Sequence, residues 1–93
     1  PAIARLGDIC TGHDEWPPRP IDSASQDVFV NVIPVHRVGD LWTIHCKGNS
    51  CHDGITSQGS PTVLVNGIPV GRVGDSISCG SSIASGSPDV FCG

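Results

Sequence analysis

A segment that occurs twice, 35 residues apart, limits the folds open to this chain. Residues 28–40 read VFVNVIPVHRVGD and residues 63–75 read VLVNGIPVGRVGD, so most positions are identical. In a chain of 93 residues such a repeat sets the architecture, because each copy has to form an equivalent structural unit.

Parts of the same motif lie at the two ends of the chain. Residues 3–8 (IARLGD) match the second half of the repeat, and residues 87–92 (SPDVFC) match the segment at residues 60–65 (SPTVLV). We therefore expect a third unit, split between the ends, that closes when the N- and C-terminal strands pair. This predicts pseudo-threefold symmetry with Gly93 near Pro1, and a closed ring without an exposed strand edge.

Each unit is expected to be a β-hairpin. Asn66-Gly67 is a strong hairpin signal, and Asn31-Val32 is a poorer one because a β-branched residue disfavours positive φ. Twelve Gly and eight Pro predict many turns and no long helix, while two Trp, two Phe and no Met predict a thin core. The sequence thus favours a single, mainly β domain over residues 1–93.

The charge balance argues against nucleic acid as a partner. Five Lys and Arg against nine Asp and Glu give a net charge of −4, whereas nucleic-acid affinity comes mainly from cationic contacts to phosphates. No apolar run reaches the roughly 18 residues of a membrane-spanning helix. The first residues lack the shape of a signal peptide, so we expect synthesis in the cytoplasm.

The loops that follow the three Gly-Asp pairs carry metal-binding side chains at matching offsets. His13 and His45 each come five residues after the Asp, and Cys79 comes four residues after it. His52, on the same loop as His45, can supply a fourth ligand. Three imidazoles and one thiolate make a closed, four-coordinate site of the structural zinc type, without an open position for catalysis. We predict a metal ion that ties the three loops together at one pole and contributes to folding.

Other interpretations of these side chains stay open. The four side chains can instead be loop residues that share no ion. His36 is a rival ligand, although Gly71 at the equivalent position favours a packing or solvated role. Cys46 and Cys51 flank the predicted ligands and can replace a His, form a disulfide or stay free. We expect free thiols, because nothing in the sequence indicates secretion.

The remaining marked side chains are expected to be structural. Tryptophans in loops favour capping of the core or shielding of the metal site, and repeated Asp residues favour turn capping. Repeated Arg residues favour ion pairing around the ring. These residues are Trp16 and Trp42; Asp8, Asp40 and Asp75; Arg5, Arg37 and Arg72; and Cys92, a small buried hydrophobe.

Together these motifs resemble the PAAR-repeat family over residues 3–92. Residues 34–37 (PVHR) and 69–72 (PVGR) correspond to the Pro-Ala-Ala-Arg motif with its two central positions changed. The Val-Gly-Asp and Ser-Pro-x-Val-Leu/Phe segments around them are intact. Residues 14–20 (DEWPPRP) look like an insertion in the first loop.

The resemblance implies a small conical fold of three β-hairpin units with the metal-bound loops at its vertex. It also implies a zinc ion held by three His and one Cys, and His13, His45, His52 and Cys79 fall at the matching positions. Iron is the alternative ion, since His/Cys sites accept both.

The function implied is a non-enzymatic, metal-stabilised tip for a membrane-piercing spike. One copy would dock on a trimeric β-helical protein, VgrG-like or a phage tail spike, and would meet the target membrane transiently. The pole opposite the metal would be the docking face, with Ile33 and Ile68 as contacts. The protein would be part of a virion tail tip or be secreted with a type VI machine. A small secreted disulfide-stapled binding module and a small zinc hydrolase are the other function classes.

Overall fold

A computed structural model describes residues 1–12 and 16–93. Within these residues, six strands form three separate antiparallel hairpins, β1–β2, β3–β4 and β5–β6. Their bounds are β1 Phe29–Val30, β2 Ile33–Pro34, β3 Leu41–Lys47, β4 Ser50–Ile55, β5 Leu64–Val65 and β6 Ile68–Pro69. The described residues contain no helix long and apolar enough to cross a membrane. The expected mainly β fold class is confirmed.

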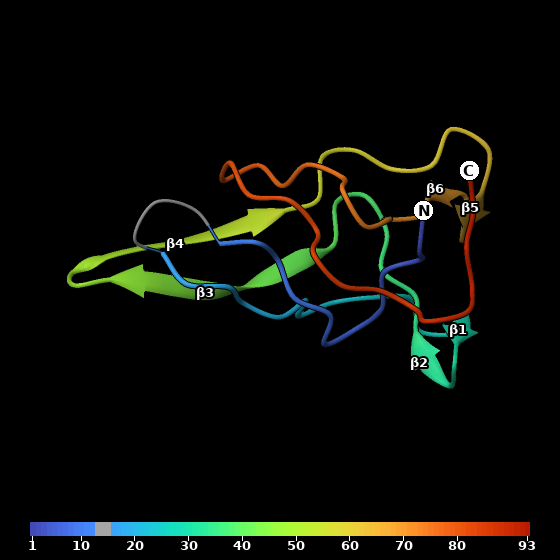
Figure 1. Ribbon diagram of the computed structural model, residues 1–93, viewed down its shortest axis with the longest axis horizontal. Helices are drawn as coiled ribbons and strands as arrows, with labels where there is room; N and C mark the ends of the chain where they lie inside the picture. The colour runs from blue at the N-terminus through green and yellow to red at the C-terminus, as the bar shows by residue number, and fades with distance from the viewer. Residues whose placement is uncertain (13–15) are drawn as a thin grey trace.

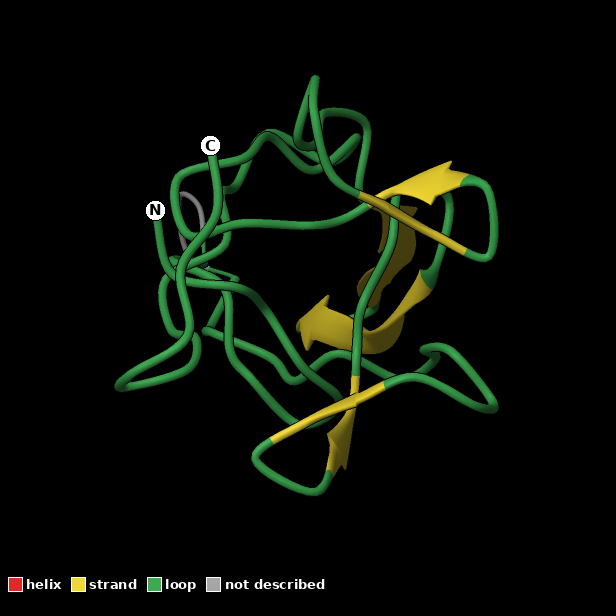
Figure 2. Ribbon diagram, turned by 90° about the vertical axis from the view of Figure 1, so that its right-hand side faces the viewer, coloured by secondary structure: helices red, strands yellow, loops and turns green. Residues whose placement is uncertain are grey.

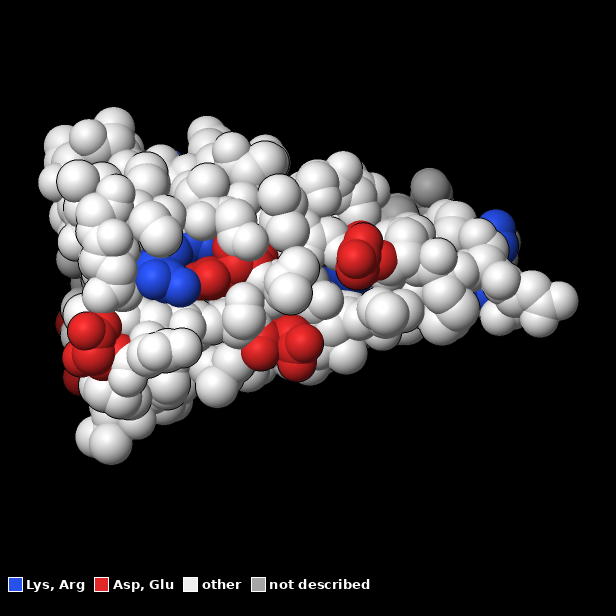
Figure 3. Space-filling model, turned by 180° about the vertical axis from the view of Figure 1, so that it is seen from behind, with Lys and Arg blue, Asp and Glu red and all other residues white. Residues whose placement is uncertain are grey.

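The molecule is a cone of 37 × 22 × 22 Å. The β3–β4 hairpin projects at the narrow end, and β1–β2, β5–β6 and both termini lie at the broad end (Figure 1). The space-filling view tapers in the same way (Figure 3). Seen along the long axis, the trace has a roughly triangular outline around that axis (Figure 2).

The chain ends complete the third unit, as the split repeat predicts. Ala2 and Phe91 form an antiparallel bridge. At the equivalent positions, Leu64 pairs with Pro69 in β5–β6, so the terminal pair has the register of an intact hairpin. The termini therefore lie side by side at the broad end (Figure 1).

Backbone hydrogen bonds join the three units around the axis. The Ala4 N–H donates to the Gly71 carbonyl at 2.9 Å, the Gly71 N–H to the His36 carbonyl at 2.9 Å, and the His36 N–H to the Ala4 carbonyl at 3.0 Å. These residues are equivalent in the repeat, so the three bonds form a closed cycle, here called the axial ring. All three residues are buried, where an unpaired backbone group would cost roughly 1–3 kcal/mol.

The repeated Arg and Asp residues close one turn in each unit. Each Asp carboxylate accepts hydrogen bonds from the backbone N–H and the side chain of the Arg three residues earlier. The turn-capping role of the Asp residues is thus confirmed, and each ion pair lies within a single unit: Arg5–Asp8, Arg37–Asp40 and Arg72–Asp75.

Two small hydrophobic clusters are stacked along the axis. The cluster near the broad end contains one or two aliphatic residues from each unit: Ile3, Val35, Val65 and Val70. The second cluster, here called the upper cluster, lies nearer the narrow end, and the first is called the lower cluster. The largest buried side chain of the upper cluster is Trp42, and its other members are Ala4, Cys10, Ile21, Ile77 and Ile83. Cys92 is half-buried and packs against the lower cluster.

The second loop differs from the expectation. The sequence predicts that His45 and His52 lie on a loop, whereas residues 41–55 fold into the β3–β4 hairpin around a turn in which Gly48 has φ +59°. A bulge between Trp42 and His45 shifts the register of this hairpin. The histidines of this segment therefore lie on paired strands and not on a loop.

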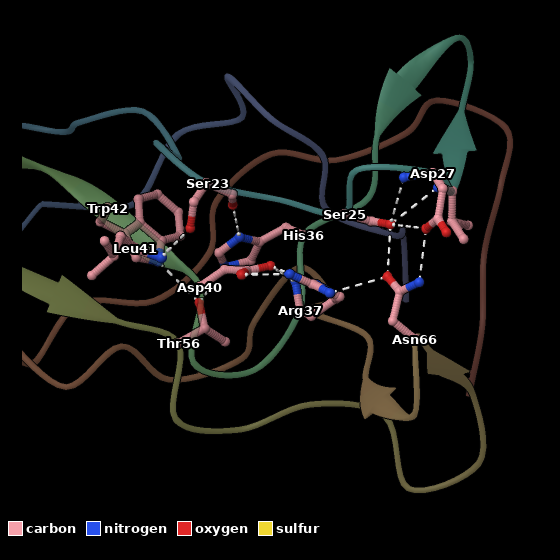
Figure 4. A network of polar contacts seen from close by, with 11 residues as sticks. Ser23, Ser25, Asp27, His36, Arg37, Asp40, Leu41, Trp42, Thr56 and Asn66 are labelled. Atoms are coloured by element: carbon pink, nitrogen blue, oxygen red, sulfur yellow. Dashed lines mark hydrogen bonds and ion pairs between the residues drawn. The ribbon is translucent and has the colours of Figure 1, made fainter.

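His36 fills space on the axis beside Gly71. Its ring is fully buried, and its Nδ1–H donates to the Ser23 carbonyl at 3.1 Å, since a carbonyl can only accept. Nε2 then accepts from the Thr56 hydroxyl at 2.6 Å, and that hydroxyl accepts from Trp42 Nε1–H at 2.9 Å. This chain of bonds, seen in Figure 4, gives His36 the packing role that the sequence favours over metal binding.

The buried, neutral His36 makes the stability depend on pH. Burial lowers the pKa of His36 below its ordinary value of 6.5, against the opposing hydrogen bond to Ser23. As pH falls below about 6.5, the unfolded chain takes up a proton that the folded ring resists, so the free energy of unfolding decreases. Urea denaturation from about pH 8 to about pH 5 should show the decrease. In the His36→Gln variant the free energy of unfolding should decrease less over this pH range. A pH profile identical to that of the wild type would show that His36 does not cause the decrease.

Gly71 is expected to be essential to the axial ring. A Cβ at this position would lie 2.8 Å from His36 Cδ2 and 3.3 Å from Ile83 Cδ1. Gly71→Ala should therefore lower the free energy of unfolding by about 1–3 kcal/mol, as measured by urea denaturation. Gly93→Ala is the control, because its nearest neighbour is 3.5 Å away. In a His36→Ala background, Gly71→Ala should lower the free energy of unfolding much less. If the effects of the two substitutions simply add, the two residues do not compete for the same space.

Candidate metal centre

Three of the four predicted ligands converge towards the narrow end. His45 comes from β3, His52 from β4 and Cys79 from the segment after β6, and one ligand atom of each lies within 4.8 Å of the others. His45 and His52 face each other across the hairpin, with their Nε2 atoms 2.6 Å apart. His13, the fourth predicted ligand, lies outside the described residues.

The surroundings of His45 orient it as a ligand. Its Nδ1 lies 2.8 Å from the Pro17 carbonyl, so Nδ1 carries the proton and Nε2 turns its lone pair towards His52. Only 4% of His45 is exposed. The two Nε2 atoms lie 2.6 Å apart, close enough for an N–H of one ring to donate to the lone pair of the other. A metal ion in the place of that proton would accept both lone pairs.

Cys79 has the environment of a metal-binding thiol. Burial raises the pKa of the thiol, but hydrogen bonds with Ser81 and the nearby Arg19 charge outweigh it, and the pKa lies below its ordinary value of 9.0. The sulfur lies 3.2 Å from Ser81 Oγ and 3.0 Å from Arg19 Nη2. The thiolate is the form that binds metal.

The donor set fits zinc. Imidazole nitrogen and thiolate sulfur are the usual ligands of structural zinc sites, and here two nitrogens and one sulfur lie close together. The same set suits iron. A site for a metal ion at His45, His52 and Cys79 is therefore supported by geometry and by donor chemistry.

The two tryptophans divide the roles that the sequence suggests for them. Trp42 is buried in the upper cluster. The Trp16 ring lies 4.9 Å from the His52 ring, and its Nε1–H donates to the Ser50 carbonyl at 3.1 Å. Trp16 therefore covers one side of the histidine pair, as expected for shielding of the site.

Cys46 and Cys51 correct the expectation of free thiols, because they form a disulfide. They are directly paired across β3–β4 with their Cα atoms 4.1 Å apart, so the hairpin itself brings the sulfurs together. Neighbouring residues of a strand point to opposite faces. The disulfide therefore lies on the exposed face, away from His45 and His52, and neither sulfur replaces a ligand.

Sequence reasoning missed Arg19, which touches the cluster. It lies in the proline-rich run of the first loop and has no counterpart in the other two units. Its distance from Cys79 along the chain gives no signal for the contact. The β3–β4 hairpin had a signal, since Gly48-Asn49 is a plausible turn between two segments of strand length.

The family model for the PAAR motif matches residues 11–85. This chain belongs to the PAAR-motif family. The match includes all six strands and the three described residues of the cluster. A search of curated proteins found no match. PAAR-motif proteins are structural proteins associated with the spike tips of type VI secretion and other contractile injection systems.

Removal of single ligands should separate this PAAR protein's metal site from its fold. His52→Ala and Cys79→Ser should each lose most of the bound metal, measured by elemental analysis after gentle purification, because each removes one of the three donors that lie together. His36→Gln should keep about one equivalent, since His36 binds Ser23 and Thr56 instead. Less than about half an equivalent in the wild type would argue against the site.

Proposed function

We propose that this PAAR protein is a metal-stabilised tip that caps and sharpens the trimeric β-helical spike of a contractile injection machine. The observation that carries the proposal lies at the broad end. Phe29, Leu64 and Phe91 are equivalent in the three units, and 53%, 60% and 63% of each is exposed. Single exposed apolar residues are ordinary. Three of them related by one pseudo-threefold axis suit a partner with true threefold symmetry, each unit meeting one subunit.

The β1–β2 turn supports the same docking face. Val32 has φ +65° and is 92% exposed, and positive φ is a genuine outlier for a β-branched residue. Gly67 adopts the equivalent turn without this cost. A strained, exposed apolar residue at the broad end is what a contact surface would retain. Ile33 and Ile68, the contacts suggested by sequence, are half-buried, so we assign the main contacts to the outgoing strands.

The narrow end would act by rigidity and not by turnover. In our proposal a zinc ion, with iron as the alternative, is held by His45, His52 and Cys79 with His13 as fourth ligand. It would tie β3–β4 to the segment after β6. The Cys46–Cys51 disulfide cross-links the same hairpin closer to its turn. Four protein ligands would leave no position for a substrate, so we propose that the protein is not an enzyme.

The setting of the protein follows from this role. We infer that residues 1–93 work as one PAAR-type domain. The protein would be made in the cytoplasm and leave the cell as part of a phage tail tip or of a secreted type VI machine. Its partner is a VgrG-like or tail-spike trimer, at one copy per trimer. Contact with the target membrane is transient, and the net charge of −4 gives no reason to include nucleic acid.

Charged substitutions at the broad end should weaken docking. Phe29→Asp, Leu64→Asp and Phe91→Asp each place a charge where apolar contact is expected, and each should weaken binding to a purified trimeric β-helical spike at least about tenfold, or about 1.4 kcal/mol. The readout is calorimetry or co-purification. Ile44→Asp is the matched control, because Ile44 is 62% exposed but lies on β3. If all three variants bound like the control, the docking face would be wrong.

A further inference from the structure

Arg19 differs from the three repeated arginines. Arg5, Arg37 and Arg72 each form an ion pair with an Asp. Arg19 is only 3% exposed, and no carboxylate pairs with it anywhere in residues 1–12 and 16–93. Its Nε is buried without a hydrogen-bond partner in that same part of the chain. A buried cation without a carboxylate partner is costly, so its position calls for a specific role.

The Arg19 side chain reaches both strands and the third loop. Nη1 donates to the Thr43 carbonyl at 2.9 Å and to the His52 carbonyl at 3.1 Å, and Nη2 donates to Cys79 Sγ at 3.0 Å. Thr43 lies in the bulge of β3, where the ladder between the strands is interrupted. One guanidinium thus joins β3, β4 and the Cys79 segment.

The hairpin leaves room for this guanidinium at Gly54. A Cβ on Gly54 would lie 2.4 Å from Arg19 Nη2 and 3.1 Å from Ile77 Cγ2. Gly54 has no positive φ, so its backbone does not require glycine. The space that it leaves is occupied by Arg19, and the Arg19–Cys79 contact depends on that space.

We propose that Arg19 is the positioning residue of the metal centre. Its fork holds Cys79 Sγ and the backbone of His52 in place before an ion binds, and its N–H group continues to donate to the sulfur once the ion is bound. This inference rests on the metal centre proposed above. A hydrogen bond to a coordinating sulfur both orients the ligand and withdraws electron density from it, and such outer contacts typically change metal affinity about 10–100-fold.

Cobalt(II) tests the proposal, because its sulfur-to-metal charge-transfer band reports directly on the thiolate. Arg19→Met should weaken Co²⁺ binding about 10–100-fold in chelator competition and move this band to lower energy. Arg19→Lys keeps the charge but loses the forked guanidinium. Its Co²⁺ affinity and its band energy should lie between those of the wild type and those of Arg19→Met. Gly54→Ala should shift the band in the same direction by displacing the guanidinium. Arg37→Met is the control for loss of an arginine outside the site, and its band should not move.

The outcomes separate the two proposals. If the wild type binds no Co²⁺, both the metal centre and the role of Arg19 are overturned. A second outcome is that the wild type binds Co²⁺ and that the folded Arg19→Lys and Gly54→Ala variants have the same Co²⁺ affinity and the same band energy as the wild type. The metal centre then stands and the role of Arg19 is overturned. A variant that unfolds at a lower temperature but keeps the wild-type band has lost a structural contact alone. That result also overturns the role of Arg19 in the metal centre. Should Arg19→Met fail to fold, the other two variants decide.

Discussion

The axial ring of three backbone hydrogen bonds is the constraint on which the rest of the structure depends. It can close only if the three return segments come within hydrogen-bonding distance of one another, which requires small residues on the axis. Ala4 and Gly71 meet this requirement, and the single large residue, His36, is accommodated because Gly71 lies beside it. A second set of three hydrogen bonds joins the units in the opposite sense, from the N–H groups of Leu6, Val38 and Val73 to the carbonyls of Pro34, Pro69 and Ala2.

The ring explains why the two ends of the cone differ. Towards the broad end, each unit leaves the axis as a short hairpin of the same length, so the threefold pattern is kept and the exposed apolar residues are equivalent. Towards the narrow end, the segments that follow the Gly-Asp turns have unequal lengths, and the second one becomes the long β3–β4 hairpin. Symmetry is therefore lost where the cone narrows, and the contacts there are individual ones.

The sequence predicted what the repeat controls. The hairpins at Asn31-Val32 and Asn66-Gly67, the terminal pairing of Ala2 with Phe91 and the Asp-capped turns all follow from local patterns that occur more than once. The narrow end was less predictable, because its contacts join residues without internal counterparts. The free state expected for Cys46 and Cys51 was wrong for a local reason, since it was argued from compartment and not from the hairpin that pairs them.

The kind of contact changes along the axis because the amount of apolar volume changes. From the broad end to the middle of the cone, the two hydrophobic clusters bury enough surface to hold the units together. At the narrow end two strands and a loop cannot enclose a hydrophobic core. Stability there has to come from cross-links between neighbouring segments. The disulfide on the outer face and the contact of Arg19 with Cys79 on the inner face are such links, and a metal ion at His45, His52 and Cys79 would be another. Covalent, ionic and metal contacts hold strands together without a core, which is the condition for a point that is both narrow and stiff.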